Sequence, residues 1–454
     1  MKRIPARRIS HVALSGIAAT LLAACGEEAK LPKNADTGSD PKLVDPVTAM
    51  IPTVNIAPAV GWPAGGKPVV AAGLAVSAYA TGFDHPRWLY VLPNGDVLVA
   101  ETNAPTRPAD NPGIKNWAMG IIKKRAGAGV PSANRITLLH GLKSDGTAES
   151  KSVFLTGLNS PFGMALIGNS LYVANTDAIV RYPYADGDPK ITAPGVKVAD
   201  LPAGEINHHW TKSLVASPDG SKLYVSVGSN SNIAENGIGN ETRRAAILVV
   251  DAASGQTRVF ASGLRNANGL TWNPQSGALW AVVNERDELG SDLVPDYMTS
   301  IKDGGFYGWP YSYYGQHIDT RVTPQKPDLV AAAIKPDYAL GAHTASLGLS
   351  FYTGNALPSR YANGAFIGQH GSWNRKPHNG YKVVFVPFRD GKPAGAIEDV
   401  VTGFLDANGN AMGRPVGVVV DKTGALLVAD DVGNVVWRVT SGSIAPKQQS
   451  RLSE

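Results

Sequence analysis

The feature that most constrains the fold of this chain is a hairpin pattern that recurs six times. In each copy an apolar strand leads into a turn built on Asn-Gly, Asp-Gly or a related pair, and a second apolar strand follows. The copies are HPRWLYVLPNGDVLVAET (85–102), SPFGMALIGNSLYVANT (160–176), KSLVASPDGSKLYVSVGS (212–229), NANGLTWNPQSGALWAVVNE (266–285), ASLGLSFYTGNALPSRYANGAFIGQH (345–370) and GRPVGVVVDKTGALLVADD (413–431). Their spacing predicts an all-β chain folded as a six-bladed β-propeller. A β-sandwich, or a pair of smaller β domains, is the alternative.

The N-terminal 25 residues have the pattern of a secretory signal. A basic start and a short apolar stretch precede LLAAC, which resembles the bacterial lipobox. We therefore expect Cys25, the only cysteine, to be diacylated and to become the mature N-terminus. Gly26 behind it favours the outer over the inner membrane, so the protein is expected in the periplasm, held to the membrane by lipid alone. An ordinary secretory signal is the alternative.

The rest of the chain divides by composition. After the lipoprotein signal peptide (1–25), residues 26–70 are expected to form a tether and an extended lead-in, because they are rich in Pro, Ala, Asp and Lys. The propeller is expected over residues 71–440, followed by a C-terminal tail over 441–454. The formal charge is only +5 over 454 residues, and no basic stripe with interleaved aromatics occurs. The sequence thus gives no case for nucleic-acid binding.

Cationic and polar residues gather in the loops that flank these hairpins. In a propeller the loops before the inner strands open on the same end of the central channel, so residues far apart in sequence converge there. Arginine forks suit carboxylates and phosphates, so these loops predict a multiply anionic ligand. Unrelated surface cations are the alternative. The loop residues are His208, His209, Arg265, Asn266, His343, Thr344, His370, Arg375, Lys376 and Arg414.

The segment NERDELGSDLVPDY is acidic and lies between predicted strands. Its carboxylates suit a hard cation such as Ca²⁺, although the spacing is not that of an EF-hand. A solvated acidic loop is the alternative. Tyr307 and Trp309, in the following GGFYGWP, suit the wall of a planar ligand site and suit core packing equally well. The acidic residues are Glu285, Asp287, Glu288, Asp292 and Asp296.

A histidine is the usual general base at neutral pH, and His208 and His209 are the candidates beside the cationic loops. Removing a hydroxyl proton while hydride leaves the carbon requires a redox cofactor, because protein side chains do not accept hydride. No GxGxxG sequence follows a strand and opens a helix, so a nicotinamide site is not supported. A phosphate-binding loop, a nucleophile elbow and a zinc pattern are also missing from the sequence.

The segments HHWTKSLVASPDG, GLRNANGL, NERDELGSDLVPDY, GGFYGWP and GQHGSWNRKP resemble those of the soluble sugar dehydrogenases that use pyrroloquinoline quinone (PQQ), especially the L-sorbosone dehydrogenase branch. The resemblance runs from about residue 50 to 440. It implies a six-bladed propeller, Ca²⁺, PQQ at the channel mouth, and oxidation of a sugar, a sugar aldehyde or a related alcohol in the periplasm. It also implies a respiratory electron acceptor.

The resemblance implies a role for each matching residue. His209 falls on the general base, and Arg265 with Asn266 on the pair that binds the quinone. Arg414 matches a further cofactor contact. The remaining matches are His343, Thr344, His370, Arg375 and Lys376 as cofactor contacts, and Glu285, Asp287, Asp292, Asp296 and the carbonyl of Tyr307 as metal ligands.

One position departs from the pattern of the glucose-oxidising relatives. They place an aspartate behind the general base, whereas this chain has Ser229. A serine hydrogen-bonds an imidazole but does not stabilise imidazolium as a carboxylate does. Either another acid orients His209, or the base is weaker, or the substrate needs less basicity, as an aldehyde hydrate would. A non-catalytic binding propeller and a Ca²⁺-dependent hydrolase of the lactonase type remain the alternative functions.

Overall fold

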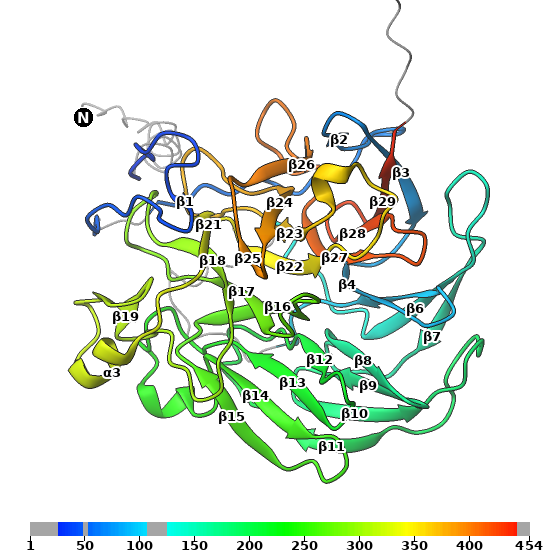
Figure 1. The fold of residues 1–454 in the computed structure, drawn as a ribbon, viewed down its shortest axis with the longest axis horizontal. Coiled ribbons are helices and arrows are strands. Elements are labelled where there is room, and N and C mark those ends of the chain that lie inside the picture. The colour runs from blue at the N-terminus through cyan, green and yellow to red at the C-terminus, as the bar shows by residue number, and fades with distance from the viewer. Residues whose placement is uncertain (1–25, 49–52, 107–124, 443–454) are drawn as a thin grey trace, which may run out of the picture.

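The computed structural model describes residues 26–48, 53–106 and 125–442. Six antiparallel sheets stand around a central axis as the blades of a β-propeller, which confirms the predicted fold (Figure 1). The six sequence hairpins supply the first and second strands of the six blades. The signal peptide, with Cys25, lies outside the described residues, as does the tail from residue 443.

Each blade is a four-stranded meander that runs from the axis outward. The inner strands are β4 (Pro86–Val91), β8 (Met164–Ile167), β12 (Leu214–Ala216), β16 (Asn266–Trp272), β22 (Ser346–Phe351) and β27 (Pro415–Val420). The second strands are β5 (Val97–Glu101), β9 (Ser170–Ala174), β13 (Lys222–Val227), β17 (Leu279–Asn284), β23 (Gly364–Gln369) and β28 (Leu426–Asp430). The third strands are β6 (Arg135–His140), β10 (Ala178–Pro183), β14 (Ala246–Asp251), β18 (Pro295–Ser300), β24 (Lys382–Arg389) and β29 (Val435–Ser441). The outer strands are β7 (Ser150–Leu155), β11 (Val196–Asp200), β15 (Thr257–Ser262), β21 (Tyr338–Ala342), β26 (Glu398–Thr402) and β3 (Leu74–Thr81).

The ring is closed by strands from the two ends of the chain. β3 pairs antiparallel with β29, from Leu74 opposite Ser441 to Thr81 opposite Val435. In Figure 1 the blue β3 and the red β29 lie side by side in the last blade. This pairing leaves no blade incomplete and ties the first described strand of the propeller to the last.

Part of the expected tether and lead-in is folded onto the propeller. β1 (Thr37–Gly38) pairs with β21 at the edge of the fourth blade, and β2 (Val69–Val70) pairs with β26 at the edge of the fifth. Asp36 also accepts a hydrogen bond from the backbone N–H of Ala342, at 2.7 Å. The segment after residue 26 therefore adds strands to two blades.

Short strands and helices lie outside the four main strands of the blades. They are β19 (Ser312–Tyr313), β20 (His317–Ile318), β25 (Lys392–Pro393), α3 (Pro327–Ala332), η1 (Ile238–Glu241) and η2 (Ser359–Tyr361). Among the helices of the described segments, none combines the length and the apolar character that crossing a membrane would require.

The second strands are buried on both faces because each blade packs between two neighbours. All five residues of β5 and of β28, and all six of β17, are buried. Around the axis, the entry loops and inner strands of five blades contribute to one apolar cluster, which includes Trp88, Phe162, Trp210, Leu347 and Val416. These side chains pack the inner strands and entry loops of neighbouring blades against one another.

Candidate functional site

The predicted cofactor residues lie at one end of the propeller, where the inner strands begin and the second strands end. We call this end the mouth and define it by His209, Arg265, His343, His370 and Arg414. These residues come from the third, fourth, fifth and sixth blades. The convergence expected from the sequence is therefore present.

His209 precedes β12 and is held by the end of the neighbouring strand. Its Nδ1 atom lies 2.9 Å from the carbonyl oxygen and 3.0 Å from the hydroxyl oxygen of Ser229. The hydroxyl of Ser229 in turn donates to the carbonyl of Ser231, at 2.6 Å. Because a carbonyl only accepts, Nδ1 carries the proton and Nε2 keeps a free lone pair.

The electrostatic surroundings keep this imidazole neutral. Burial, then the charge of Arg265, lower the pKa of His209 well below its usual value of 6.5. In the described part of the chain no carboxylate hydrogen-bonds His209. Glu241 stands one step further back, where it accepts hydrogen bonds from the hydroxyl of Ser231 and, at 2.8 Å, from the backbone N–H of Asn230. Serine therefore replaces the orienting acid directly behind His209.

Arg265 is saturated by the protein. Its guanidinium donates to the carbonyl of Glu285 at 2.6 Å, to the side-chain oxygen of Asn232 at 3.0 Å and to the carboxylate of Asp287 at 3.0 Å. The side chain holds two loops of the mouth together beside His209. Asn266, the first residue of β16, has a buried side-chain oxygen with no hydrogen-bond partner in the described structure.

Asp287 joins the fourth blade to the fifth. It lies 3.7 Å from Nδ1 of His343 and accepts a hydrogen bond from Asn374 at 2.8 Å. Burial opposes ionisation of Asp287, but Arg265 and His343 outweigh it and hold its pKa at about 2. Burial likewise opposes protonation of His343, but Asp287 raises the pKa of this imidazole. The two form an ion pair at the wall of the mouth.

A second cluster completes the ring and contains Arg87, which the sequence analysis did not identify. Asp431 lies 2.9 Å from Nε2 of His370 and 3.1 Å from the guanidinium of Arg87. Arg87 stands over the ring of Trp210, 5.8 Å from its centroid, and Trp210 follows His209 in the chain. Burial lowers the pKa of His370 to about 4. Burial opposes ionisation of Asp431, yet His370 and Arg87 hold its pKa far below the usual range.

The sequence pattern does not identify Arg87 as a site residue, because Arg87 lies in a β-bulge. Pro86 pairs with Glu101 and Trp88 with Ala100, so Arg87 is the extra residue between them. Bulges re-aim side chains and are frequent beside functional sites. If HPRWLY formed a regular strand, the sequence would not indicate a site role for Arg87. Its position at the start of an inner strand is the sequence signal that indicates the mouth.

Arg414 stands beside this cluster at the start of the sixth blade. Its guanidinium donates to the carbonyl of Ala57 at 2.9 Å and stacks over the ring of Tyr381, and its charge lowers the pKa of both His370 and Arg87. Its backbone N–H donates to Asp430 at 2.7 Å. Burial raises the pKa of Asp430 to about 6.

The mouth fits an anionic ligand. Buried donors at the Nε atoms of Arg87 and Arg414 have no hydrogen-bond partner in the described structure. Buried donors without acceptors are costly, and an anion supplies acceptors to both. The donor set thus matches a planar polycarboxylate such as PQQ.

Arg375 and Lys376 face a different neighbour, the N-terminal segment. Arg375 donates to the carbonyl of Ser291 at 2.9 Å and lies 3.5 Å from Asp292, whose carboxylate also accepts from the backbone N–H of Lys30. The carbonyl of Lys376 accepts from the N–H of Ala29, at 2.7 Å. The structure thus gives both residues a role in docking this segment, and their contact with a cofactor stays a prediction.

The predicted metal ligands contact protein groups, although Glu285 Oε1 and Asp292 Oδ1 are buried without a hydrogen-bond partner among the described residues. Glu285 pairs with Arg286 at 3.0 Å, and Asp296 accepts from the N–H of Glu285 and from the hydroxyl of Thr344. The hydroxyl of Tyr307 donates to the carbonyl of Ser300, at the end of β18 away from the mouth. No three His, Cys, Asp or Glu side chains of the described residues form a group that could hold a metal ion. Because Ca²⁺ also takes backbone carbonyl ligands, such as the predicted carbonyl of Tyr307, calcium binding stays a prediction.

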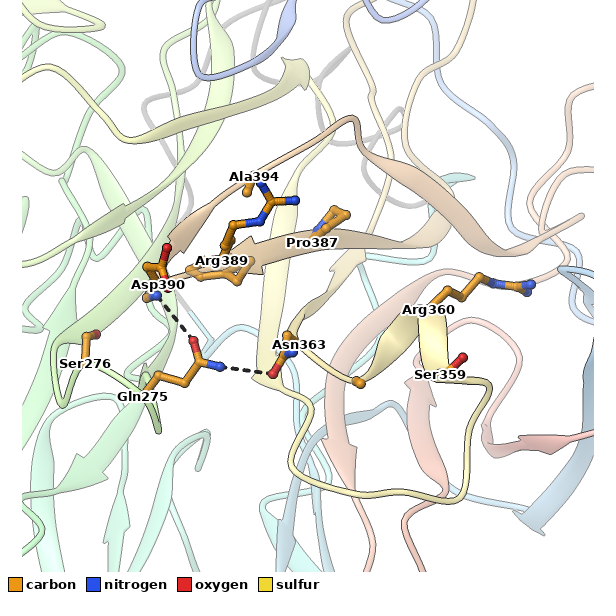
Figure 2. Close-up of a pocket in the computed structure, with 12 residues that line it drawn as sticks. Gln275, Ser276, Ser359, Arg360, Asn363, Pro387, Arg389, Asp390 and Ala394 are labelled. Atoms are coloured by element: carbon orange, nitrogen blue, oxygen red, sulfur yellow. Dashed lines mark hydrogen bonds between the residues drawn. The ribbon is translucent and has the colours of Figure 1, made fainter.

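A groove of about 610 Å³ lies at the opposite end of the fourth and fifth blades. Figure 2 shows Gln275 bridging the blades by hydrogen bonds to Asn363 and to the backbone N–H of Gly391. Arg360 points away from the other labelled residues there and donates to the carbonyl of Ala72. This groove has none of the converging groups that mark the mouth.

Comparisons with known proteins agree with this architecture. The PQQ-dependent pyranose dehydrogenase of Coprinopsis cinerea is 26% identical over 294 residues, which are 55% of this chain and 39% of that longer protein. The holo form of its PQQ domain superposes with a TM-score of 0.66 at 22% identity, covering 85% of this chain and 100% of the domain. A calcium structure of a Carbohydrate-Active Enzymes family AA12 protein from Trichoderma reesei gives 0.66 at 19% identity, covering 87% and 100%. At these identities the superpositions show the fold.

The sequence itself decides the family. Residues 130–302 and 317–442 match the family described as TrAA12-like. These ranges contain five of the six predicted hairpins and all five residues that define the mouth. The match covers well over half of the chain. The chain belongs to the TrAA12-like family.

Proposed function

We propose that this protein is an oxidoreductase that oxidises a sugar, with PQQ as its cofactor. The observation that carries the proposal is the state of His209: a neutral imidazole whose protonated nitrogen is fixed by Ser229, at a mouth ringed by cations. The PQQ-dependent pyranose dehydrogenase among the relatives supports the cofactor and the substrate class.

The residues of the mouth would have different roles in cofactor binding and proton transfer. Arg87 and Arg414 would hold the carboxylates of PQQ, since both are cationic and have unpaired buried donors, and His370 would contact the cofactor as a neutral imidazole. Asn266 offers a free carbonyl oxygen beside His209. Bound PQQ would supply the acceptor for the hydride that leaves the substrate carbon. His209 Nε2 takes the proton of the hydroxyl on that carbon, so the alcohol becomes a carbonyl.

The finer substrate class follows from the base. With Ser229 in place of an acid, His209 is oriented but its imidazolium is not stabilised by an adjacent carboxylate. This favours a substrate whose hydroxyl proton is more acidic, such as the hydrate of a sorbosone-like sugar aldehyde. Periplasmic location through a lipid on Cys25 and electron transfer to a respiratory acceptor complete the proposal.

The experiment is reconstitution of the purified protein with PQQ, followed by dye reduction with a panel of sugars, sugar aldehydes and alcohols. Turnover with a member of the panel supports the proposal. The variant His209→Ala should lose turnover while it retains the quinone absorbance on gel filtration. Quinone retention by the wild type without turnover of any substrate would instead favour the non-catalytic binding propeller.

Calcium is tested separately, because no group of three His, Cys, Asp or Glu side chains among the described residues marks its site. The EDTA-treated protein is loaded with PQQ and then titrated with Ca²⁺. A stoichiometric gain in turnover and in PQQ retention would establish the ion. Equal turnover and retention with and without Ca²⁺ would remove it from the proposal.

A further inference from the structure

We propose that a cavity beside the mouth, over the first and second blades, binds the additional sugar units of a neutral oligosaccharide. The inference rests on the proposed function and names its substrate class. The cavity measures about 650 Å³, within the range of about 300–1,000 Å³ that is usual for ligand pockets. The loops that form it are those entering and leaving the inner hairpins, on the same end of the propeller as His209.

The floor of the cavity is rigidly joined to the candidate base. Asn207, which lines the cavity, donates to the hydroxyl oxygen of Thr176 at 2.8 Å and accepts from Arg244 at 2.9 Å. Thr176 in turn donates to the carbonyl of Trp210, at 3.0 Å. The segment from Asn207 to Trp210 therefore carries both the cavity floor and His209.

Unused polar groups face this cavity. Ser160 is only 1% exposed, and its hydroxyl has no hydrogen-bond partner in the described structure, whereas its backbone N–H is fixed by Asn134 at 2.8 Å. The side chains of Asn159, Asp177 and Glu205 are exposed at the rim and make no hydrogen bond within the described structure. A buried hydroxyl without a partner is costly, so a ligand that supplies one stabilises the site.

The chemistry of these groups selects the ligand. Hydroxyl, amide and carboxylate groups donate to and accept from sugar hydroxyls. No Lys, Arg or His is among the described residues that line the cavity, and two carboxylates stand at its rim. This is the reverse of the cationic mouth, so the cavity disfavours anionic sugars and suits neutral ones.

The position of the cavity argues for more than one sugar unit. The unit that reacts must bring its hydroxyl to His209 Nε2 over the mouth. The cavity reaches Asn207, two residues before His209 in the chain, and extends across the same end of two blades to Asn134. A ligand that occupies both places is longer than one ring.

The test compares maltotriose, cellotriose, trigalacturonate and D-glucose by titration calorimetry and by kcat/KM with the PQQ-loaded enzyme. A neutral trisaccharide should bind more tightly than glucose and than trigalacturonate. The variants Asp177→Asn, Asn159→Ala and Ser160→Ala should weaken this binding by about 5- to 10-fold each and leave glucose oxidation unchanged. Matched controls are Asp188→Asn and Asn169→Ala, which lie at the opposite end of the second blade and should have no effect.

The outcomes separate this inference from the proposed function. If neither neutral trisaccharide binds better than glucose, or if the three variants bind it as the wild type does, the cavity is not a sugar site, while sugar oxidation can still stand. If calorimetry shows variant-sensitive trisaccharide binding but no sugar is oxidised, the cavity assignment holds and the proposed function falls.

Discussion

The Nδ1 atom of His209 lies 2.9 Å from the carbonyl oxygen of Ser229 and 3.0 Å from its hydroxyl oxygen. One residue thus supplies two acceptors to one imidazole N–H. The carbonyl fixes the tautomer regardless of the side chain at this position, because it belongs to the backbone. The chain can therefore dispense with an aspartate behind the base and still keep Nε2 free.

The first prediction concerns the protonation of His209. Burial and Arg265 lower its pKa well below 6.5, so the neutral form with the proton on Nδ1 should persist as the pH falls past 6.5. Nitrogen NMR of the imidazole in the cofactor-free protein measures this directly. Arg265→Gln removes a positive charge and should raise this pKa. A wild-type value at or above 6.5 would contradict the environment described here.

The second prediction separates the two acceptors of Ser229. Ser229→Ala removes the hydroxyl but leaves the carbonyl that fixes the tautomer. We expect kcat to fall by only about 3- to 10-fold, equivalent to one ordinary hydrogen bond. Steady-state kinetics with the reconstituted enzyme provide the measurement. A loss of several thousand-fold would show that the hydroxyl, and not the carbonyl, controls the imidazole.

The third prediction concerns the position of His209, which a substitution at a neighbouring glycine should change without altering a reactive side chain. A Cβ atom added at Gly228 would stand 2.4 Å from Cβ of His209 and 2.6 Å from the side-chain oxygen of Asn266. Gly228→Ala should therefore displace His209 and lower kcat by roughly 100-fold, as a misplacement of about 1 Å can. The control is Gly239→Ala, where the added atom meets nothing within 4 Å. Equal activities of the two variants would mean that the position of His209 is unimportant.

The fourth prediction links His370 to acid stability. Burial lowers its pKa to about 4, so between pH 6.5 and 4 the unfolded chain binds a proton there that the folded chain does not. The free energy of unfolding is therefore unaffected by this group above pH 6.5. As the pH falls towards 4, protonation of the unfolded chain lowers it by up to about 3 kcal/mol.

Urea unfolding of the wild type and of His370→Gln across this pH range tests the linkage. The difference between the two curves isolates His370 from other groups, such as Asp430, whose pKa is raised to about 6 and whose contribution changes in the opposite direction. The variant should lose less stability than the wild type on acidification. Parallel curves would rule out the depressed pKa.

The sequence predicted the blades because each hairpin is specified locally. Alternating or wholly apolar strands around turns such as Pro93-Asn94-Gly95 determine strand length, register and direction within a few residues. Six copies then predict closure, and closure predicts that His209, Arg265 and Arg414 meet at one end. These steps need only local patterns and the geometry of a ring.

The three-dimensional structure decided what depends on contacts between distant segments. Strand β3 pairs with β29, so the two ends of the propeller domain meet in one blade. The segment 26–48, which its composition predicted to be a tether, docks beside Arg375 and Lys376, which were predicted to contact a cofactor. Arg87 enters the mouth through a bulge that only the register with β5 reveals. The acidic residues of the fourth blade, predicted from the sequence as metal ligands, are buried in the folded chain, where Asp287 contacts Arg265, Glu285 contacts Arg286 and Asp296 accepts from a backbone N–H; their role as metal ligands stays a prediction. Burial and pairing are properties of the folded chain, so no spacing along the sequence encodes them visibly.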